Sequence, residues 1–385
     1  MMAGPPGCVM IVAGEASGDH HGANLVRALR RRDPSLVFVG IGGEALRDAG
    51  VRVRVDARTL AVVGITEVFA KLPGLLRGMS TAKGLLRDLR PDLLILIDFP
   101  DFNLHLAKTA RRLGIPVLYY ISPQVWAWRS GRVRTVGRRT DLVATILPFE
   151  DRFYRRHGVP AVFVGHPLLD DPDLPLAPVA PAEGPTVGLL PGSRDREIAR
   201  HLPLMLEAAH QLAAARPRED LRFLVSVAGA VDPAHVASIV AAQPGPAGFE
   251  IVSGGARRVF SRCALVVAVS GTVTLEAAIA GVPAVIIYRV SPLSYWLGRL
   301  LIRVRHISLA NLIFGRPLLP ELIQDAATPE AIAETAGRML DAPDQLNGLR
   351  KRLRGIRHLL GGPGASDRVA RIARSMIRRD GRKRS

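Results

Sequence analysis

Cysteine, acidic residues and lysine are all scarce in this chain of 385 residues. The two cysteines, Cys8 and Cys263, lie far apart in the sequence, so neither a disulfide framework nor a cysteine-based zinc site is expected. The first residues contain no basic segment, and the apolar run that follows them is too short for a secretory signal peptide. We therefore expect a cytoplasmic protein.

The shortage of acidic residues leaves a formal net charge of +18 and a pI near 11.1. A field of that sign attracts nucleic acid, anionic lipid or phosphorylated substrates. Most of the positive charge is arginine, which can follow from genome composition alone, so only its sign is interpreted. The sequence has no helix-turn-helix, zinc-finger or RNP pattern, and we predict no specific nucleic-acid partner.

One hydrophobic run, LVVAVSGTVTLEAAIAGVPAVIIY at 265–288, carries a single charge, that of Glu276, and is long enough for a membrane span. Gly281 and Pro283 interrupt it, and Ser270-Gly271-Thr272 stands where a strand would pass into a helix. LVVAV and VPAVIIY have the composition of buried parallel strands, and TVTLEAAIA that of a helix. The run therefore predicts a β-α-β unit rather than a span.

Short apolar strands alternate with helical segments in both halves of the chain, which predicts an α/β fold with parallel sheets covered by helices. A stretch rich in proline and acids separates the two series. We predict an N-terminal domain at 1–168, a linker at 169–185, a second domain at 186–360, and a C-terminal helix with a basic tail at 361–385. Two α/β domains of this kind predict a cleft at the carboxyl ends of the strands of both sheets.

The segment VAGEASGDHHGANL at 12–25 is typical of a strand, a glycine-rich turn and a helix. Free N–H groups at the start of the helix favour an anion, so Glu15, Ser17 and Gly18 are candidates for substrate binding. An ordinary strand–helix turn with Ser17 or Asp19 as its N-cap is an equally good interpretation.

The segment LLILIDFPDFN at 93–103 places Asp98 at the end of a very apolar strand. An acid at the tip of a parallel strand faces the cleft and can act as a general base. Capping of a helix accounts for Asp101 but leaves Asp98 without a structural explanation. Asp98 is therefore the candidate base.

In the second half, LLPGSRDREIARHL at 189–202 repeats the strand–turn–helix pattern. Arg194 follows Gly192-Ser193 at a strand end, where a guanidinium can bind a diphosphate through two N–H groups; a surface arginine in a charged turn is the plainer alternative. The amides of Ser270-Gly271-Thr272, at a second helix start, could share that diphosphate. Glu276 could accept hydrogen bonds from a ribose, because a carboxylate among alanine, leucine and isoleucine is costly to bury without a partner.

Two stretches, 69–90 and 295–305, combine basic residues with apolar residues near helical spacing. The apolar positions in the first are Leu72, Leu75, Leu76, Met79, Leu86 and Leu89. A helix packed on a sheet explains either stretch, but two of them together with the net charge favour contact with an anionic membrane surface. A third stretch, 121–136, places two tryptophans beside arginines such as Arg132, either as structural stacking or as a surface for sugar or lipid.

Several of these segments, taken together, resemble the bacterial lipid-A-disaccharide synthase family. They are, in chain order, GEASGD, FPDFN, SPQVWAWR, LPFE, GHPL, LPGSR followed by EI, SGT, TLEA, SLANLIFGRPLLPELIQ and GASDR. The resemblance runs from about residue 9 to about residue 372 in the family's order, which makes it more specific than any single motif. It implies a GT-B glycosyltransferase with two Rossmann-like domains.

The reaction implied by the resemblance joins UDP-2,3-diacylglucosamine to 2,3-diacylglucosamine 1-phosphate (lipid X). It releases UDP and forms the β-1,6-linked disaccharide of lipid A, with inversion at the anomeric carbon. No cofactor and no metal are expected. The implied partners are these two substrates and the anionic inner-membrane surface, with the enzyme cytoplasmic and peripheral on that membrane; a homodimer is left open.

In the implied roles, Asp98 deprotonates the 6-hydroxyl of the acceptor. Arg194 and the turn at 270–272 stabilise the departing UDP, while Glu276 holds its ribose. A further pair from the matching stretch, Asn311 and Gln324, lines the nucleotide side. The alternatives are another GT-B transferase that acts on a lipid-linked acceptor, and a UDP-sugar epimerase.

Overall fold

The computed structural model describes residues 7–60, 65–128, 130–171, 174, 185–229, 231–291 and 306–377. The chain divides into two compact units, one formed by residues 1–170 with 360–385 and the other by residues 171–359. The C-terminal helix belongs to the first unit. Most of the linker and the whole amphipathic stretch at 295–305 fall outside the described residues.

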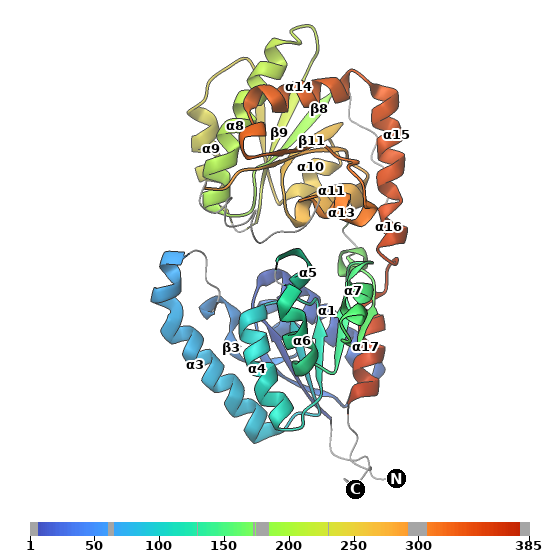
Figure 1. The fold of residues 1–385 in the computed structure, drawn as a ribbon. Coiled ribbons are helices and arrows are strands. Elements are labelled where there is room, and N and C mark those ends of the chain that lie inside the picture. The colour runs from blue at the N-terminus through green and yellow to red at the C-terminus, as the bar shows by residue number, and fades with distance from the viewer. Residues whose placement is uncertain are drawn as a thin grey trace. The chain divides into compact units, whose positions relative to one another are not determined.

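The described strands of the N-terminal unit are β1 (Cys8–Ala13), β2 (Val37–Gly42), β3 (Arg52–Asp56), β4 (Leu93–Ile97), β5 (Val117–Tyr120), β6 (Leu142–Thr145) and β7 (Ala161–Phe163). They form one parallel sheet in the order β3-β2-β1-β4-β5-β6-β7. Figure 1 draws the strands of this unit among its helices. The central strands are runs of apolar residues, as expected where both faces of a sheet are covered. The strand order reverses between β1 and β4, which is the switch point of a doubly wound sheet.

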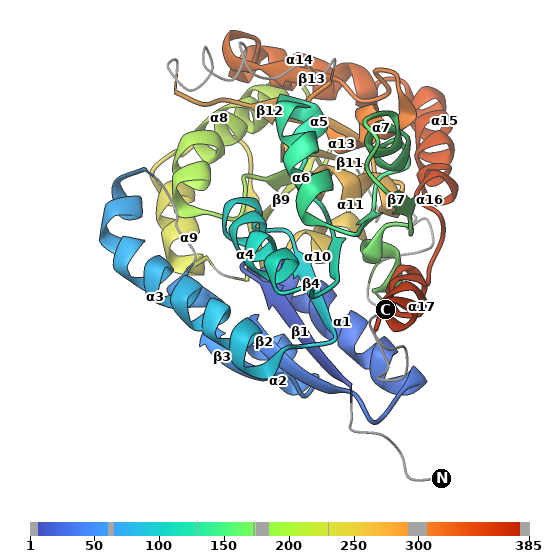
Figure 2. The same ribbon diagram turned by 60° about the horizontal axis from the view of Figure 1, so that its bottom comes forward.

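The described helices of this unit are α1 (Ala16–Arg32), α2 (Glu44–Asp48), α3 (Ile65–Leu89), α4 (Pro100–Arg112), α5 (Val125–Trp128), α6 (Val133–Arg139), α7 (Glu150–Arg156) and α17 (Ala365–Met376), with short 3₁₀ turns η1 (Ala57–Thr59), η2 (Ser130–Arg132) and η3 (Pro167–Asp170). They cover both faces of the sheet (Figure 2). Val9 and Ile11 of β1 pack in the core formed with α1 and α17. Met10 and Val12, which point the other way, pack in the core formed with α3, α4 and α6.

The C-terminal helix α17 returns to the N-terminal unit and packs against α1 (Figure 2). Asp170 fixes its start, because the Asp170 carboxylate accepts hydrogen bonds from the backbone N–H groups of Gly364, Ala365 and Ser366 at 2.6, 2.9 and 2.7 Å. These are the orphan donors of the first turn, which need an acceptor. The Asp170 carboxylate therefore fixes the start of α17 on the N-terminal unit.

The strands described for the C-terminal unit are β8 (Thr186–Leu190), β9 (Arg222–Val227), β10 (Phe249–Ser253), β11 (Leu265–Val269), β12 (Ala284–Tyr288) and β13 (Glu321–Ile323). They form a parallel sheet in the order β10-β9-β8-β11-β12-β13, with a switch point between β8 and β11. Its described helices are α8 (Asp195–Ala214), α9 (Pro233–Ala241), α10 (Ala256–Phe260), α11 (Thr272–Ala280), α13 (Leu309–Phe314), α14 (Pro329–Leu340), α15 (Pro343–Arg354) and α16 (Ile356–Leu359), with the 3₁₀ turn η4 (Gln324–Ala326). The predicted α/β class is confirmed in both units.

The hydrophobic run at 265–288 forms β11, α11 and β12, so the predicted β-α-β unit is confirmed. Gly281 ends α11 in the left-handed conformation, with φ of 76°. The run is apolar throughout because its two strands are buried in the middle of a sheet. No helix in the described ranges is long and apolar enough to cross a membrane.

The first amphipathic stretch lies on α3, and most of its apolar residues face the core rather than solvent. Leu86 is fully buried, and Leu75 and Met79 pack against the core beneath the helix. Leu75 and Met79 are only partly buried there, and their predicted contact with lipid stays a prediction. Leu76 and Leu89 are exposed, by 61% and 47%. Leu72 is among the residues whose side chains are not described.

Candidate active site

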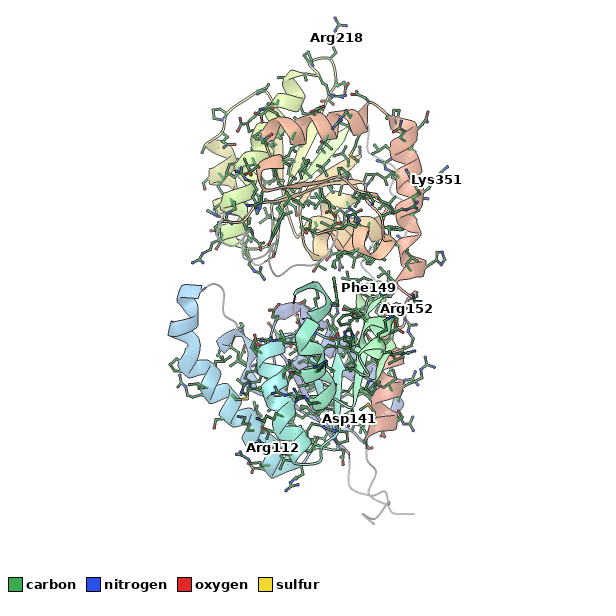
Figure 3. All side chains as sticks on the ribbon, viewed as in Figure 1. Arg112, Asp141, Phe149, Arg152, Arg218 and Lys351 are labelled. Carbon is green, nitrogen blue, oxygen red and sulfur yellow. The ribbon has the colours of Figure 1, made fainter. Side chains whose placement is uncertain are left out.

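The sequence-predicted residues of the N-terminal unit gather where the strand order of its sheet reverses. Glu15 follows β1 and Asp98 follows β4, and these two strands are neighbours. Figure 3 shows Phe149 at the end of this unit where α5 lies, and Asp141, which precedes β6, at the opposite end. The predicted residues therefore belong to the carboxyl end of the sheet, where doubly wound folds bind ligands.

Asp98 sits in a strained turn that its neighbours hold in place. Asp98 and Phe99 have φ values of 46° and 48°, in the left-handed region that costs a non-glycine residue about 1–3 kcal/mol. The Asn103 side chain donates from Nδ2 to the carbonyls of Ile97 and Asp98, at 3.1 and 2.6 Å. The Tyr119 hydroxyl donates to the Asp98 carbonyl at 2.8 Å. Three hydrogen bonds thus fix the backbone that presents the Asp98 carboxyl.

The Asp98 carboxyl lines a pocket of about 370 Å³ between the ends of β4, β5 and β6. Burial, reinforced by the negative charge of Glu15, raises the pKa of Asp98 to about 6. Such a carboxyl is a stronger base than an exposed aspartate and is still mostly ionised at pH 7. The geometry and the pKa suit general base catalysis.

The same pocket contains a second buried carboxyl, Glu150, which sequence reasoning missed. Glu150 is 1% exposed and accepts hydrogen bonds from Trp126 Nε1 at 2.9 Å and from the backbone N–H groups of Ile146 and Leu147 at 3.2 and 3.1 Å. Burial raises its pKa to about 7. The Trp126 and Phe149 rings also form a T-shaped pair, with centroids 4.8 Å apart. Glu150 therefore ties α5 to the turn after β6, and both segments form walls of the pocket.

In the glycine-rich turn after β1, the residue that caps α1 is not the expected Ser17 or Asp19. Glu15 is the N-cap of α1 and its side chain makes no capping hydrogen bond. Asp19 does not cap α1 either, because its carboxylate accepts from the N–H groups of Gly43 and Ala45 at the start of α2. Glu15 and Ser17 are exposed, whereas Gly18 is buried where α1 packs against β4. The turn leaves the first side chains of α1 open to a ligand.

In the C-terminal unit, the turn after β8 already binds a carboxylate. The Ser193 N–H and the Arg194 guanidinium both donate to Glu197, at 3.1 and 3.0 Å. Gly192 makes this possible: its φ is 122°, and a Cβ there would lie 2.7 Å from Glu197 Oε2. Arg194 is 61% exposed. The turn therefore has the donors that an oxyanion such as a phosphate requires.

The neighbouring turn after β11 is open at the start of α11. Gly271 and Thr272 are exposed, and a Cβ on Gly271 would meet nothing within 4 Å. Because β8 and β11 are adjacent strands, the turns that follow them end at the same edge of the sheet. Glu276 is half-buried and is not isolated among apolar residues as expected, because Arg257 Nε lies 3.7 Å from its carboxylate. Burial nevertheless raises the pKa of Glu276 above its usual value.

Asn311 and Gln324 hold the loops around them. Asn311 is fully buried; its Nδ2 donates to the Leu319 carbonyl and to Glu321, and its Oδ1 accepts from the N–H groups of Leu318 and Leu319. Gln324 has φ of 53°, and its amide both donates to and accepts from the backbone of Val290. We therefore expect the Asn311 amide to act on a ligand only through the loop that it supports.

Comparison with known proteins assigns the family. Residues 9–359 match the family described as lipid-A-disaccharide synthetase. The chain belongs to the lipid-A-disaccharide synthase family. A lipid-A-disaccharide synthase of Geobacter sulfurreducens is 48% identical over 379 residues, which cover 96% of this chain and 97% of that protein. One from Syntrophus aciditrophicus is 47% identical over 382 residues, with 96% and 98% covered.

Solved structures similar to this member of the lipid-A-disaccharide synthase family support its fold class. A putative UDP-N-acetylglucosamine 2-epimerase from Listeria monocytogenes superposes with a TM-score of 0.64 at 15% identity, over 96% of this chain and 95% of that one. MurG from Acinetobacter baumannii gives 0.61 at 17% identity, over 96% and 100%. At such identity the likeness concerns the fold alone, and the predicted GT-B class is confirmed.

The family assignment makes the chain a glycosyltransferase of lipid A biosynthesis. The sequence placed Asp98 and Arg194 at strand ends, where the structure also has them. It did not indicate Glu150 or Arg257, although the turn motif LPFE was the available signal for Glu150. In the part of the chain that the structure describes, no three His, Cys, Asp or Glu side chains come together as a metal site would need.

Proposed function

We propose that the chain transfers 2,3-diacylglucosamine from UDP to the 6-hydroxyl of 2,3-diacylglucosamine 1-phosphate (lipid X), with inversion to a β-1,6 linkage. The observation that carries this proposal is Asp98, a carboxyl with a pKa of about 6 in the wall of a 370 Å³ pocket. An alcohol is a poor nucleophile until its proton is removed, and a base titrating near the working pH removes it best. Asp98 takes that proton, and the alkoxide displaces UDP.

The C-terminal unit binds the nucleotide in this proposal. Arg194 and the N–H groups of the turns at Ser193 and at 270–272 stabilise the negative charge on departing UDP. The Glu276 carboxylate accepts hydrogen bonds from the ribose hydroxyls. Positive ends of helices and arginine supply the charge that a divalent metal would otherwise provide, so no metal or cofactor is required.

The test is to incubate the protein with both acylated substrates and to identify the products by mass spectrometry. We expect UDP and a disaccharide 1-phosphate in equal amounts, with the same rate in EDTA. Formation of an altered UDP-sugar when the acceptor is omitted would favour the epimerase instead. Transfer to a different lipid-linked acceptor, with lipid X inert, would identify another GT-B transferase.

The enzyme is also proposed to work as a peripheral protein on the cytoplasmic face of the inner membrane, because both substrates carry acyl chains. Leu76 is an exposed apolar residue near the middle of α3, beside the exposed Arg77. Since α3 follows β3, Leu76 lies nearer than Leu89 to the carboxyl end of the sheet, where the Asp98 pocket lies. A leucine next to a basic residue is suited to an anionic lipid surface. A homodimer remains compatible with this arrangement.

Replacing Leu76 by serine should weaken binding to vesicles that contain anionic lipid by roughly tenfold, because one inserted leucine side chain is lost. High salt should weaken binding of both proteins. Leu89→Ser is the matched control, since Leu89 is also exposed but lies about 20 Å further along α3. Vesicle sedimentation measures the effect. Equal loss in both variants, or no loss in Leu76→Ser, would contradict a membrane contact at Leu76.

A further inference from the structure

The pocket beside Asp98 contains an arginine that the proposed reaction does not yet use. Arg132, the last residue of η2, lines the pocket, and its guanidinium NH1 lies 2.7 Å from Asp101 Oδ1. The Arg132 side chain is 35% exposed and the Asp101 side chain 77% exposed. Among the described residues that line this pocket, Arg132 is the only cation, and it stands with three carboxyl groups, those of Asp98, Asp101 and Glu150.

These three carboxyl groups create an electrostatic problem for a phosphorylated acceptor. A phosphate that enters such a pocket is repelled unless a cation offsets the carboxylates. The planar guanidinium of arginine presents several N–H donors in the geometry that phosphate oxygens accept. The pair that Arg132 makes with Asp101 is largely exposed and hence weak, so a more highly charged phosphate can replace Asp101 as its partner.

We propose that Arg132 binds the phosphate on C1 of the acceptor sugar and so selects a phosphorylated acceptor. This inference rests on the proposed function, in which the acceptor is a glucosamine 1-phosphate. The placement agrees with the size of one sugar: Asp98 and Asp101 are three residues apart, so their Cα atoms are separated by at most about 11 Å. In glucosamine 1-phosphate, the phosphate on C1 and the CH2OH group on C5 flank the ring oxygen, so a single sugar can place its 6-hydroxyl at the base and its phosphate at Arg132.

The test compares two acceptors, 2,3-diacylglucosamine 1-phosphate and 2,3-diacylglucosamine, in the same detergent micelles. In Arg132→Gln, kcat/KM for the phosphorylated acceptor should fall roughly 10- to 100-fold, the usual effect of losing a hydrogen bond to a charged group. The value for the phosphate-free acceptor should stay unchanged, so discrimination between the two is lost. Arg132→Lys, which keeps the charge, should recover part of the discrimination.

Arg134→Gln is the matched control, because Arg134 is an exposed arginine two residues away that is not among the described residues lining the pocket. It removes the same charge and should preserve discrimination. An equal fall for both acceptors in Arg132→Gln, or the same loss of discrimination in Arg134→Gln, would overturn the assignment.

A binding measurement separates this inference from the proposed function. Calorimetric titration with soluble glucosamine 1-phosphate should show binding to the unaltered protein and weaker binding to Arg132→Gln. Identical binding to both proteins, or none to the unaltered one, would refute the Arg132 site. If the unaltered protein transferred sugar to neither acylated acceptor, the proposed function would be wrong, while the titration would still decide the role of Arg132.

Discussion

Asp98→Asn should lower kcat by about two to four orders of magnitude, the usual contribution of a positioned general base. Asparagine keeps the shape of the side chain but cannot take the proton of the acceptor hydroxyl. It also tolerates the φ of 46° found at this position, so the turn held by Asn103 and Tyr119 should persist. The Kd for UDP should not change, because no nucleotide contact is removed. Steady-state kinetics and calorimetry measure the two quantities.

The pH dependence of the unaltered enzyme supplies an independent check on this base. A base must be deprotonated to act, so kcat/KM should rise as the pH increases through about 6, the raised pKa of Asp98, and then level off. This rise should be absent from the residual activity of Asp98→Asn. Glu150, with a pKa of about 7, lines the same pocket, and a rise centred nearer 7 that survived in Asp98→Asn would point to Glu150.

Asp101→Asn is the matched control for the base, because it removes a neighbouring carboxylate that is 77% exposed. We expect a much smaller loss of kcat from it than from Asp98→Asn. Near-normal turnover in Asp98→Asn, or a loss of UDP binding along with turnover, would show that the base is another group. A large loss in Asp101→Asn would then point to Asp101, and otherwise Glu15 and Glu150 would be the next carboxyls to test.

The sequence was sufficient to predict the fold and the ends of the strands, since both follow from local pattern. The segment LLILID is typical of a buried strand followed by an acidic residue, and in the structure β4 ends just before Asp98. The run at 265–288 could be resolved into β-α-β because Gly281 and the turn at 270–272 interrupt it. Such signals lie within one or two elements and need no knowledge of distant contacts.

What the sequence could not supply were contacts between residues far apart in the chain. The hydrogen bond from Trp126 to Glu150, 24 residues later, and the pair of Glu276 with Arg257 are not visible in a local pattern. The helical spacing of Leu75 and Met79 indicated an apolar face correctly but not what covers it, and the core under α3 does. The return of α17 to the N-terminal unit likewise depends on Asp170, which is nearly two hundred residues from the N–H groups that it binds.

The second large effect is expected at Arg194, which belongs to the C-terminal unit. The turn before α8 binds the Glu197 carboxylate through the Ser193 N–H and the Arg194 guanidinium, which are donors that phosphate oxygens also accept from. A diphosphate carries more charge than Glu197 and should replace it on the same donors. The start of the 20-residue helix α8 adds its partial positive charge to the same place.

Arg194→Ala should therefore weaken UDP binding roughly 10- to 100-fold, as expected for the loss of a charge-assisted hydrogen bond, and should lower kcat as well. The value of kcat falls too because the negative charge on the diphosphate, which Arg194 stabilises, grows as UDP departs. Arg196→Ala is the control: Arg196 is exposed in the first turn of the same helix, and its loss removes the same charge. Calorimetry with UDP and single-turnover rates measure the outcome. Because Asp98→Asn should reduce turnover alone, normal UDP affinity in Arg194→Ala would remove this arginine from the nucleotide site and leave the base assignment intact.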